Sequence, residues 1–532
     1  MKYFAALLFF VGSLTAQQSP VVDPVLASGL GTLHHPVTTS NAEAQKWFDQ
    51  GLRYVFAFNH EAAIDSFRRA TQLDPDLAMG YWGIALALGP NINMDVDPDR
   101  EKQAFDAVQM AQAHAARASN EEQALIAVLA KRYSNDANAD LHQLARDYSS
   151  AMGELSKKYP DDLDLATLYA ESMMDLRPWK FWSHDGKPAE GTEEIVATLE
   201  SVLKRDPKHV GANHYLIHAL EASPHPERAL SSAKRIAGLA PAAGHLVHMP
   251  AHIFQRVGDY AGAARANANA ADVDRAWIAQ HGPESMYVGM YYNHNLQFGS
   301  ASFATIGDLP NAKKMADELG ANAVQFAKMF PPVETFAVTP SLILVHFAKW
   351  KDVLAVPDPE AGPVSTALWH FTIGTAHAQL GNVLGAQSDQ RELEKALPAI
   401  TTDFGFTQNS QKDLVTVASH LLAGRIAMAC GDSAAAIAHY EQAVAAEDTL
   451  NYDEPPDWWL PARETLGAAL LRAGRASDAE RVFTEDLAHN PHSPRSLFGL
   501  AEARKAQKKD ASAARAEFQR MWKGGALHID DL

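Results

Sequence analysis

The chain has 532 residues, of which 47% are hydrophobic, and it carries a formal net charge of −18. This acidic balance, with no stripe of Lys and Arg, argues against a nucleic-acid partner, because phosphate binding needs clustered positive charge. The single cysteine, Cys430, excludes an internal disulfide. Alanine-rich segments recur from about residue 41 to the end, and they predict an all-α protein.

Residues 1–16 have the layout of a secretory signal peptide. Lys2 precedes an apolar run from Tyr3 to Val11, and small residues stand before Gln17. The apolar run is too short for a membrane span, which needs ~20 residues. We therefore expect cleavage after Ala16, a periplasmic or secreted protein without a membrane span, and an exposed polar N-terminal arm over 17–40.

The first helical segment after the arm carries a recognisable repeat signature. Its residues are Trp47, Gly51, Tyr54, Ala63, Phe67, Ala70 and Pro75, and Gln50 stands where Leu is usual. With these residues the chain resembles secreted bacterial tetratricopeptide-repeat (TPR) proteins. The resemblance implies a TPR-type α-solenoid, in which helix–turn–helix units stack side by side.

Later segments repeat one step of this signature, twelve residues from a Gly or Ala to the next small residue. The step is found at Ala251 to Ala263, Gly374 to Ala386, Gly424 to Ala436 and Gly467 to Ala479. We predict roughly ten units over about 41–525, with degenerate stretches around 90–140 and 320–365. A Pro-rich hinge at 355–363 divides an N-terminal array, 41–354, from a C-terminal array, 364–525.

Two histidine pairs stand one 34-residue repeat apart, His214 with His218 and His248 with His252. The i,i+4 spacing places both rings of a pair on one face of a helix. Glu221 extends the first pair by one turn. The resemblance implies that these positions, on the first helix of each unit, face the concave groove where TPR proteins bind ligands.

Neighbouring helix axes lie ~8–10 Å apart, so four such imidazoles can converge on one ion. Imidazole and carboxylate ligands suit Zn, Cu, Fe or Ni. We predict a transition-metal site whose ligands are His214, His218, Glu221, His248 and His252. We expect further ligand-binding contacts in this N-terminal array from His245, Arg256 and His294.

Other interpretations of the histidines remain open. Each of them can be an ordinary polar residue with satisfied hydrogen bonds, or part of a metal-free groove that uses His and Glu for acid–base work. The chain as a whole can be an adaptor of the cell envelope that holds a peptide or partner protein, or a metal-dependent hydrolase or oxidase. The leading hypothesis is an exported solenoid that binds a small molecule or peptide, with a transition metal, in a His-rich groove.

Overall fold

The computed structural model describes residues 25–283, 285–400 and 408–532, and in these ranges the chain forms helices and no strand. The predicted all-α fold is therefore confirmed. The predicted signal peptide, 1–16, lies outside the described residues and stays a prediction. No helix within the described ranges is both long enough and apolar enough to cross a membrane.

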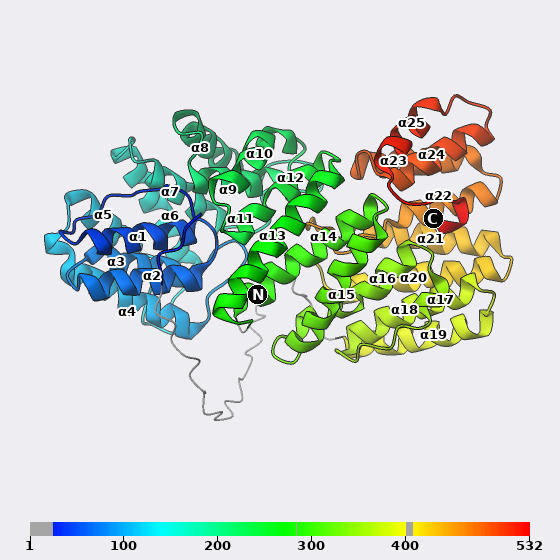
Figure 1. Cartoon of the computed structure of the whole chain (residues 1–532), viewed down its shortest axis with the longest axis horizontal. Helices are drawn as coiled ribbons and strands as arrows, with labels where there is room; N and C mark the ends of the chain where they lie inside the picture. Colours follow the sequence, from blue (N-terminus) through cyan, green and yellow to red (C-terminus); the bar gives the residue numbers. More distant parts are fainter. Residues whose placement is uncertain (1–24, 284, 401–407) are drawn as a thin grey trace.

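Consecutive helices pack against each other along the chain, so that helical hairpins stack from one end of the molecule to the other (Figure 1). The helices up to residue 283 are α1 (Ala42–Val55), α2 (His60–Leu73), α3 (Ala78–Leu88), α4 (Pro98–His114), α5 (Asn120–Leu129), α6 (Leu141–Lys158), α7 (Leu163–Met174), α8 (Thr192–Arg205), α9 (Val210–Glu221), α10 (Leu230–Leu239), α11 (Gly244–His248), α12 (Pro250–Arg256) and α13 (Tyr260–His281).

The remaining helices continue the stack to the C-terminus. They are α14 (Asn293–Thr305), α15 (Leu309–Phe326), α16 (Thr339–His346), α17 (Trp350–Val353), α18 (Pro363–Gln379), α19 (Val383–Ala396), α20 (Gln411–Ala429), α21 (Ser433–Glu447), α22 (Ala462–Arg472), α23 (Ala476–His489), α24 (Pro494–Ala506) and α25 (Ser512–Met521). A π-helical turn, Val288–Tyr292, precedes α14, and 3-10 turns fill several junctions.

The small residues of the repeat signature are needed where helices touch. A Cβ atom on Gly51 would lie 2.5 Å from the ring of Phe67, and one on Gly83 would lie equally close to the other side of the same ring. Phe67 is fully buried between α1, α2 and α3. Tight turns precede several second helices, with left-handed backbone at Gly258, Gly307, Gly381, Gly431 and Gly474.

The described part of the arm, 25–40, is hydrogen-bonded to the helices, while most of its residues remain exposed as expected from its sequence. Leu30 is buried, and the guanidinium of Arg53 donates to the Leu33 carbonyl. Gln50 accepts a hydrogen bond from the Ala27 amide at 2.7 Å and donates to Ser66 at 3.2 Å. The departure from the repeat signature at Gln50 therefore fastens the arm to the first unit.

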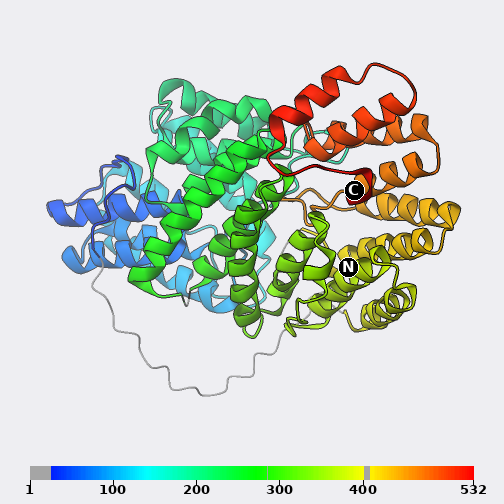
Figure 2. The same cartoon turned by 45° about the vertical axis from the view of Figure 1, so that its right-hand side comes forward.

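The stack curves so that its last units return to its middle, as the two views show (Figure 1 and Figure 2). The Tyr260 hydroxyl, at the start of α13, donates to the Pro491 carbonyl at 3.0 Å. The Lys523 amide donates to the Ile306 carbonyl at 2.8 Å. The segment between α21 and α22 is thereby brought over the helices that carry the predicted metal site.

Candidate metal centre

Four helices, α9, α11, α12 and α14, carry the predicted histidines. These are His214 and His218, then His245, His248 and His252, and last His294. Pro250 has no amide hydrogen, which interrupts the helical bonding between α11 and α12. Met249 nevertheless keeps helical backbone angles, φ −48° and ψ −33°. The i,i+4 spacing of His248 and His252 is therefore preserved across the interruption.

His214, His218 and His245 form one compact group, here called the first trio. One ring nitrogen of each lies within 4.8 Å of the others. The Nε2 atoms of His214 and His245 are 3.0 Å apart. All three side chains are buried. His245, which the sequence placed among the ligand-binding contacts, thus stands beside the first pair, and its ring also stacks on His248 of α11 with centroids 5.7 Å apart.

His248, His252 and His294 form a second compact group, here called the second trio, with one nitrogen of each again within 4.8 Å of the others. The Nε2 atoms of His248 and His252 are 2.7 Å apart. The His294 ring comes from α14 and is half-buried. The two predicted pairs therefore fall in different groups, and the groups adjoin, because the His218 and His252 rings have centroids 5.5 Å apart and the His245 and His248 rings 5.7 Å apart.

Glu221 lies between the trios. Its Oε1 is 2.8 Å from Nδ1 of His218, and its Oε2 is 2.5 Å from Nδ1 of His252. Glu221 was predicted as a metal ligand. In the structure its Oε1 is hydrogen-bonded to His218 of the first trio, and its Oε2 lies beside His252 of the second trio, so this carboxylate contacts both groups.

Protein acceptors fix which nitrogen of each deep ring carries the hydrogen. Nδ1–H of His214 donates to the Phe56 carbonyl at 2.8 Å. Nδ1–H of His248 donates to Oδ1 of Asn267 at 2.6 Å, and the Asn267 amide in turn donates to the Ala263 carbonyl, which fixes its orientation. Each neutral ring then presents the Nε2 lone pair to its trio. This is the arrangement in which metal-binding histidines are commonly held.

The inner nitrogens are poorly satisfied by the protein itself. Nε2 of His218 and Nδ1 of His245 are buried without a hydrogen-bond partner. Nδ1 of His248 donates to Asn267, so Nε2 of His248 presents a lone pair, and it lies 2.7 Å from Nε2 of His252. Lone pairs at that separation repel unless a proton or a metal cation lies between them.

Burial keeps the deepest rings of the cluster neutral. It lowers the pKa of His214, His245 and His248 well below the usual histidine value, and neighbouring imidazoles lower it further. Burial alone would raise the pKa of Glu221, but His252 and His218 outweigh it and lower this pKa to about 2. The rings of His214, His245 and His248 are therefore in the deprotonated form that metals bind.

Aromatic rings enclose the first trio. The Phe58 ring stacks on His218 and His245, with centroids 5.8 Å and 5.5 Å away, and meets His214 edge-on at 4.5 Å. Tyr291 packs against His245 at 4.7 Å. The sequence carried no signal for Phe58, because it comes from the turn between α1 and α2, far away along the chain.

A small pocket of about 90 Å³ opens onto both trios. Four histidines line it, two from each trio, which are His218, His245, His252 and His294. The segment between α21 and α22 supplies acidic residues to the opposite wall, including Asp453 and Glu454. Arg256, predicted to bind ligand, does not line this pocket. Its guanidinium donates to the Glu221 carbonyl at 2.9 Å and lies over the Tyr452 ring.

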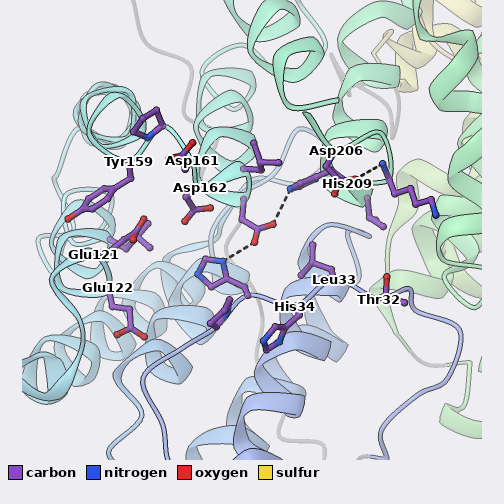
Figure 3. Close-up of a pocket in the computed structure, with 18 of the residues that line it drawn as sticks. Thr32, Leu33, His34, Glu121, Glu122, Tyr159, Asp161, Asp162, Asp206 and His209 are labelled. Atoms are coloured by element: carbon purple, nitrogen blue, oxygen red, sulfur yellow. Dashed lines mark hydrogen bonds and ion pairs between the residues drawn. The ribbon is translucent and has the colours of Figure 1, made fainter. Parts of the chain in front are cut away.

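A larger pocket, of about 980 Å³, lies near the N-terminal arm (Figure 3). His209 and His35 both hold Asp164, at 3.0 Å and 2.8 Å, which ties the arm to α7 and α9. In this larger pocket, these histidine and aspartate side chains thus already bond to one another. The unsatisfied nitrogens of the two trios make the smaller pocket the stronger candidate for chemistry.

Asp274 supports the start of α11. It accepts hydrogen bonds from the Tyr287 hydroxyl at 2.9 Å and from Asn295 at 2.7 Å, and the Tyr287 oxygen accepts from the His245 amide at 3.2 Å. Burial raises the pKa of Asp274 to about 7. Gly244 is required here, because a Cβ atom would lie 1.8 Å from Oδ1 of Asp274.

Asp274→Asn is expected to change how stability depends on pH. The folded-state pKa of Asp274 lies above its unfolded value of 3.8, so its stabilising contribution is complete below that value and is lost as the pH rises towards 7. Relative to wild type, the asparagine variant should therefore gain about 2–3 kcal/mol between about pH 5 and about pH 8. Urea unfolding at both pH values measures this, and parallel pH curves for the two proteins would contradict it.

Comparison with known proteins identifies the repeat but no ligand. A sequence profile described as tetratricopeptide repeat matches residues 417–449, in α20 and α21. No curated protein matches the sequence. The predicted TPR-type α-solenoid is thereby confirmed as the class of fold.

Distant solved structures share the stacked helices. A human IFIT1 dimer with PPP-AAAA is 12% identical, with a TM-score of 0.32 over 88% of each chain. Yeast Tom70 is 11% identical, with a TM-score of 0.30 over 88% of this chain and 90% of its own. The APC/C hetero-tetramer Cut9-Hcn1 is 14% identical, with a TM-score of 0.30 over 91% of this chain and 75% of its own.

Proposed function

We propose that this protein is an exported TPR-type solenoid that binds a transition metal in the buried cluster formed by the two histidine trios and Glu221. The observation that carries the proposal is the pair of ring nitrogens, Nε2 of His248 and Nε2 of His252, which face each other 2.7 Å apart in a buried place. A cation between such nitrogens replaces repulsion with bonds to both rings.

The donor set favours borderline metals. Neutral imidazole nitrogens suit Zn, Cu, Fe or Ni, whereas Mg and Ca prefer oxygen ligands. The one thiol, Cys430, is exposed at the end of α20. An ion that keeps a coordination position free acts as a Lewis acid or activates a bound water.

The site fits an ion better than a peptide. Adaptor proteins grip peptides on an open groove, but here the pocket is about 90 Å³, and ligand pockets for larger molecules usually hold about 300–1,000 Å³. Water occupies about 30 Å³ per molecule in the liquid. A metal ion with a few waters or another very small ligand therefore matches the space in front of the histidines.

Elemental analysis of protein purified without a histidine tag tests the proposal. We expect bound transition metal in the wild type and a marked loss in His252→Ala, with little change in helicity by circular dichroism. His370→Ala is the matched control, because His370 is paired with Asp389 in the C-terminal array and its loss should leave the metal content unchanged. If His252→Ala lowers stability but not metal content, these histidines are ordinary packing residues.

The proposed export depends only on the sequence of residues 1–17. Intact-mass measurement of the protein recovered from its native host decides it. A chain starting near Gln17 in the periplasm or the medium supports export, whereas a chain retaining Met1 in the cytoplasm contradicts it.

A further inference from the structure

The two trios occupy equivalent positions in consecutive repeat units. Ala229, Ala263 and Ala312 are fully buried small residues near the start of the second helical segment of three successive units. They serve as reference positions, from which every histidine of the cluster can be counted back along the chain.

In each trio, two histidines stand 15 and 11 residues before the reference alanine of one unit, and the third stands 18 residues before that of the next unit. For the first trio these are His214 and His218 before Ala229, and His245 before Ala263. For the second they are His248 and His252 before Ala263, and His294 before Ala312. The second trio is thus the first trio moved along by one unit.

The ring geometry repeats with the sequence positions. The two rings that stand one turn apart have centroids separated by 4.9 Å in the first trio and 4.6 Å in the second. The deepest ring and the ring from the next unit are 4.8 Å and 4.7 Å apart, crossing at 77° and 78°. The remaining two rings are 5.9 Å and 5.8 Å apart, inclined at 20° and 25°.

The equivalent positions in the neighbouring repeat units do not carry histidine, so the trio occurs only twice in succession. Gly211 stands 18 residues before Ala229, and a Cβ atom there would lie 2.5 Å from the Phe56 ring. Gln297 and Ala301 stand 15 and 11 residues before Ala312. The units before and after the cluster therefore lack the imidazoles that would complete a third set.

Glu221 is shared by the two copies. The equivalent position one unit later is Gln255, so a single carboxylate serves both trios. It contacts His218 in the first trio and His252 in the second, which are equivalent residues. Repetition of the unit and a shared central carboxylate together produce a cluster of two matched halves.

We propose that the cluster holds two metal ions, one in each three-histidine set, with Glu221 as the positioning residue common to both. This rests on the proposed metal-binding function and adds the number of ions and their arrangement. Three protein ligands leave a metal ion an open coordination position. Because two histidines of each trio line the same small pocket, both open positions face one shared space.

A ligand in that space would face both histidine sets. Two-metal centres commonly bind small oxygen ligands or substrates between ions about 3.5–4 Å apart. The pocket volume of about 90 Å³ limits the ligand to a few heavy atoms. The ligand class is therefore a small molecule or anion with one or two donor atoms, such as hydroxide.

Metal stoichiometry of the full chain tests the inference. Metal-free wild type is titrated with Zn²⁺ and analysed for bound zinc after gel filtration. We expect two ions per chain. The double variants His214→Gln/His245→Gln and His248→Gln/His294→Gln should each bind one, and the combination of all four should bind none. His35→Ala is the control for zinc held near Asp164, and it should still bind two.

The outcomes separate the two proposals. One ion in the wild type, lost in either double variant, would overturn the two-ion arrangement and leave the metal-binding function intact. No ion above the level of the fourfold variant would overturn both. Glu221→Gln should weaken binding at both sites together, by about 10–100-fold. If zinc binding weakened at only one site, Glu221 would not be shared by the two trios. The Glu221→Gln variant keeps all six histidines, so it tests the inference independently of the histidine variants.

Discussion

Phe58→Ala is expected to lower the free energy of unfolding by about 3–5 kcal/mol, the usual loss for removing a buried phenylalanine ring. The ring is 3% exposed, and it covers all three imidazoles of the first trio. Its removal leaves a cavity beside polar side chains, so water can reach more of the buried rings. Urea unfolding of the metal-free protein measures the loss.

The same variant should weaken zinc binding at the first trio and leave the second unaffected, because Phe58 contacts only the first. Phe67→Ala is the matched control. It removes an equally buried ring between α1, α2 and α3, so it should cost similar stability without changing zinc binding. Equal zinc affinity in both variants would show that Phe58 has no part in forming the site.

Arg495→Met should cause a comparable loss, about 3–5 kcal/mol, because it leaves a buried carboxylate without its partner. Nε of Arg495 donates to Glu464 at 2.6 Å, and both side chains are 6% exposed. Further hydrogen bonds reach the His346 carbonyl at 2.9 Å and the Asp531 carbonyl at 2.8 Å. Arg495 thus joins α24 to α22, to the end of α16 and to the C-terminus.

The control removes both charges. Arg495→Met combined with Glu464→Leu should recover a large part of the stability, because neither charge is then buried alone. Urea unfolding of the wild type, the single variant and the double variant provides the comparison. A double variant less stable than the single one would contradict the assignment of the loss to the unpaired carboxylate.

The repeat units could be predicted because their signature reports contacts within one hairpin. Gly51 and Phe67 touch directly, so their spacing records the packing of α1 on α2. The glycine turns at Gly258 and Gly307 are equally local. The stretch at 320–365 was degenerate in sequence, and there the structure has a 3-10 segment, Pro331–Val338, and the short helices α16 and α17.

The sequence identified the histidines of the candidate site, but it did not show how they divide into two trios. The i,i+4 spacing and the 34-residue repeat placed the histidine pairs on matching helix faces. Which histidine joins which pair depends on how one unit is rotated against the next, and that rotation has no signature within a single unit. His245 therefore joins the pair on α9, and His294 joins the pair on α11 and α12.

The repeat pattern could not predict contacts that distant segments of the chain make with the site. The Phe56 carbonyl and the Phe58 ring reach the cluster from the first unit, and Asn267 reaches it from the second helix of its own unit. Arg256 was predicted to contact ligand. It turned out to hold the end of α9, since the helix carbonyls there need a donor.

Anomalous scattering from crystals of the full chain grown with Zn²⁺ tests the central claim most directly, because it locates each ion without reference to activity. We expect two peaks in the anomalous difference map at the zinc absorption edge, one in each trio. Each peak should lie about 2.0–2.1 Å from the ring nitrogens that bind the ion. Anomalous peaks found only elsewhere, for example beside His35 and Asp164, with the six imidazoles free of metal, would contradict it.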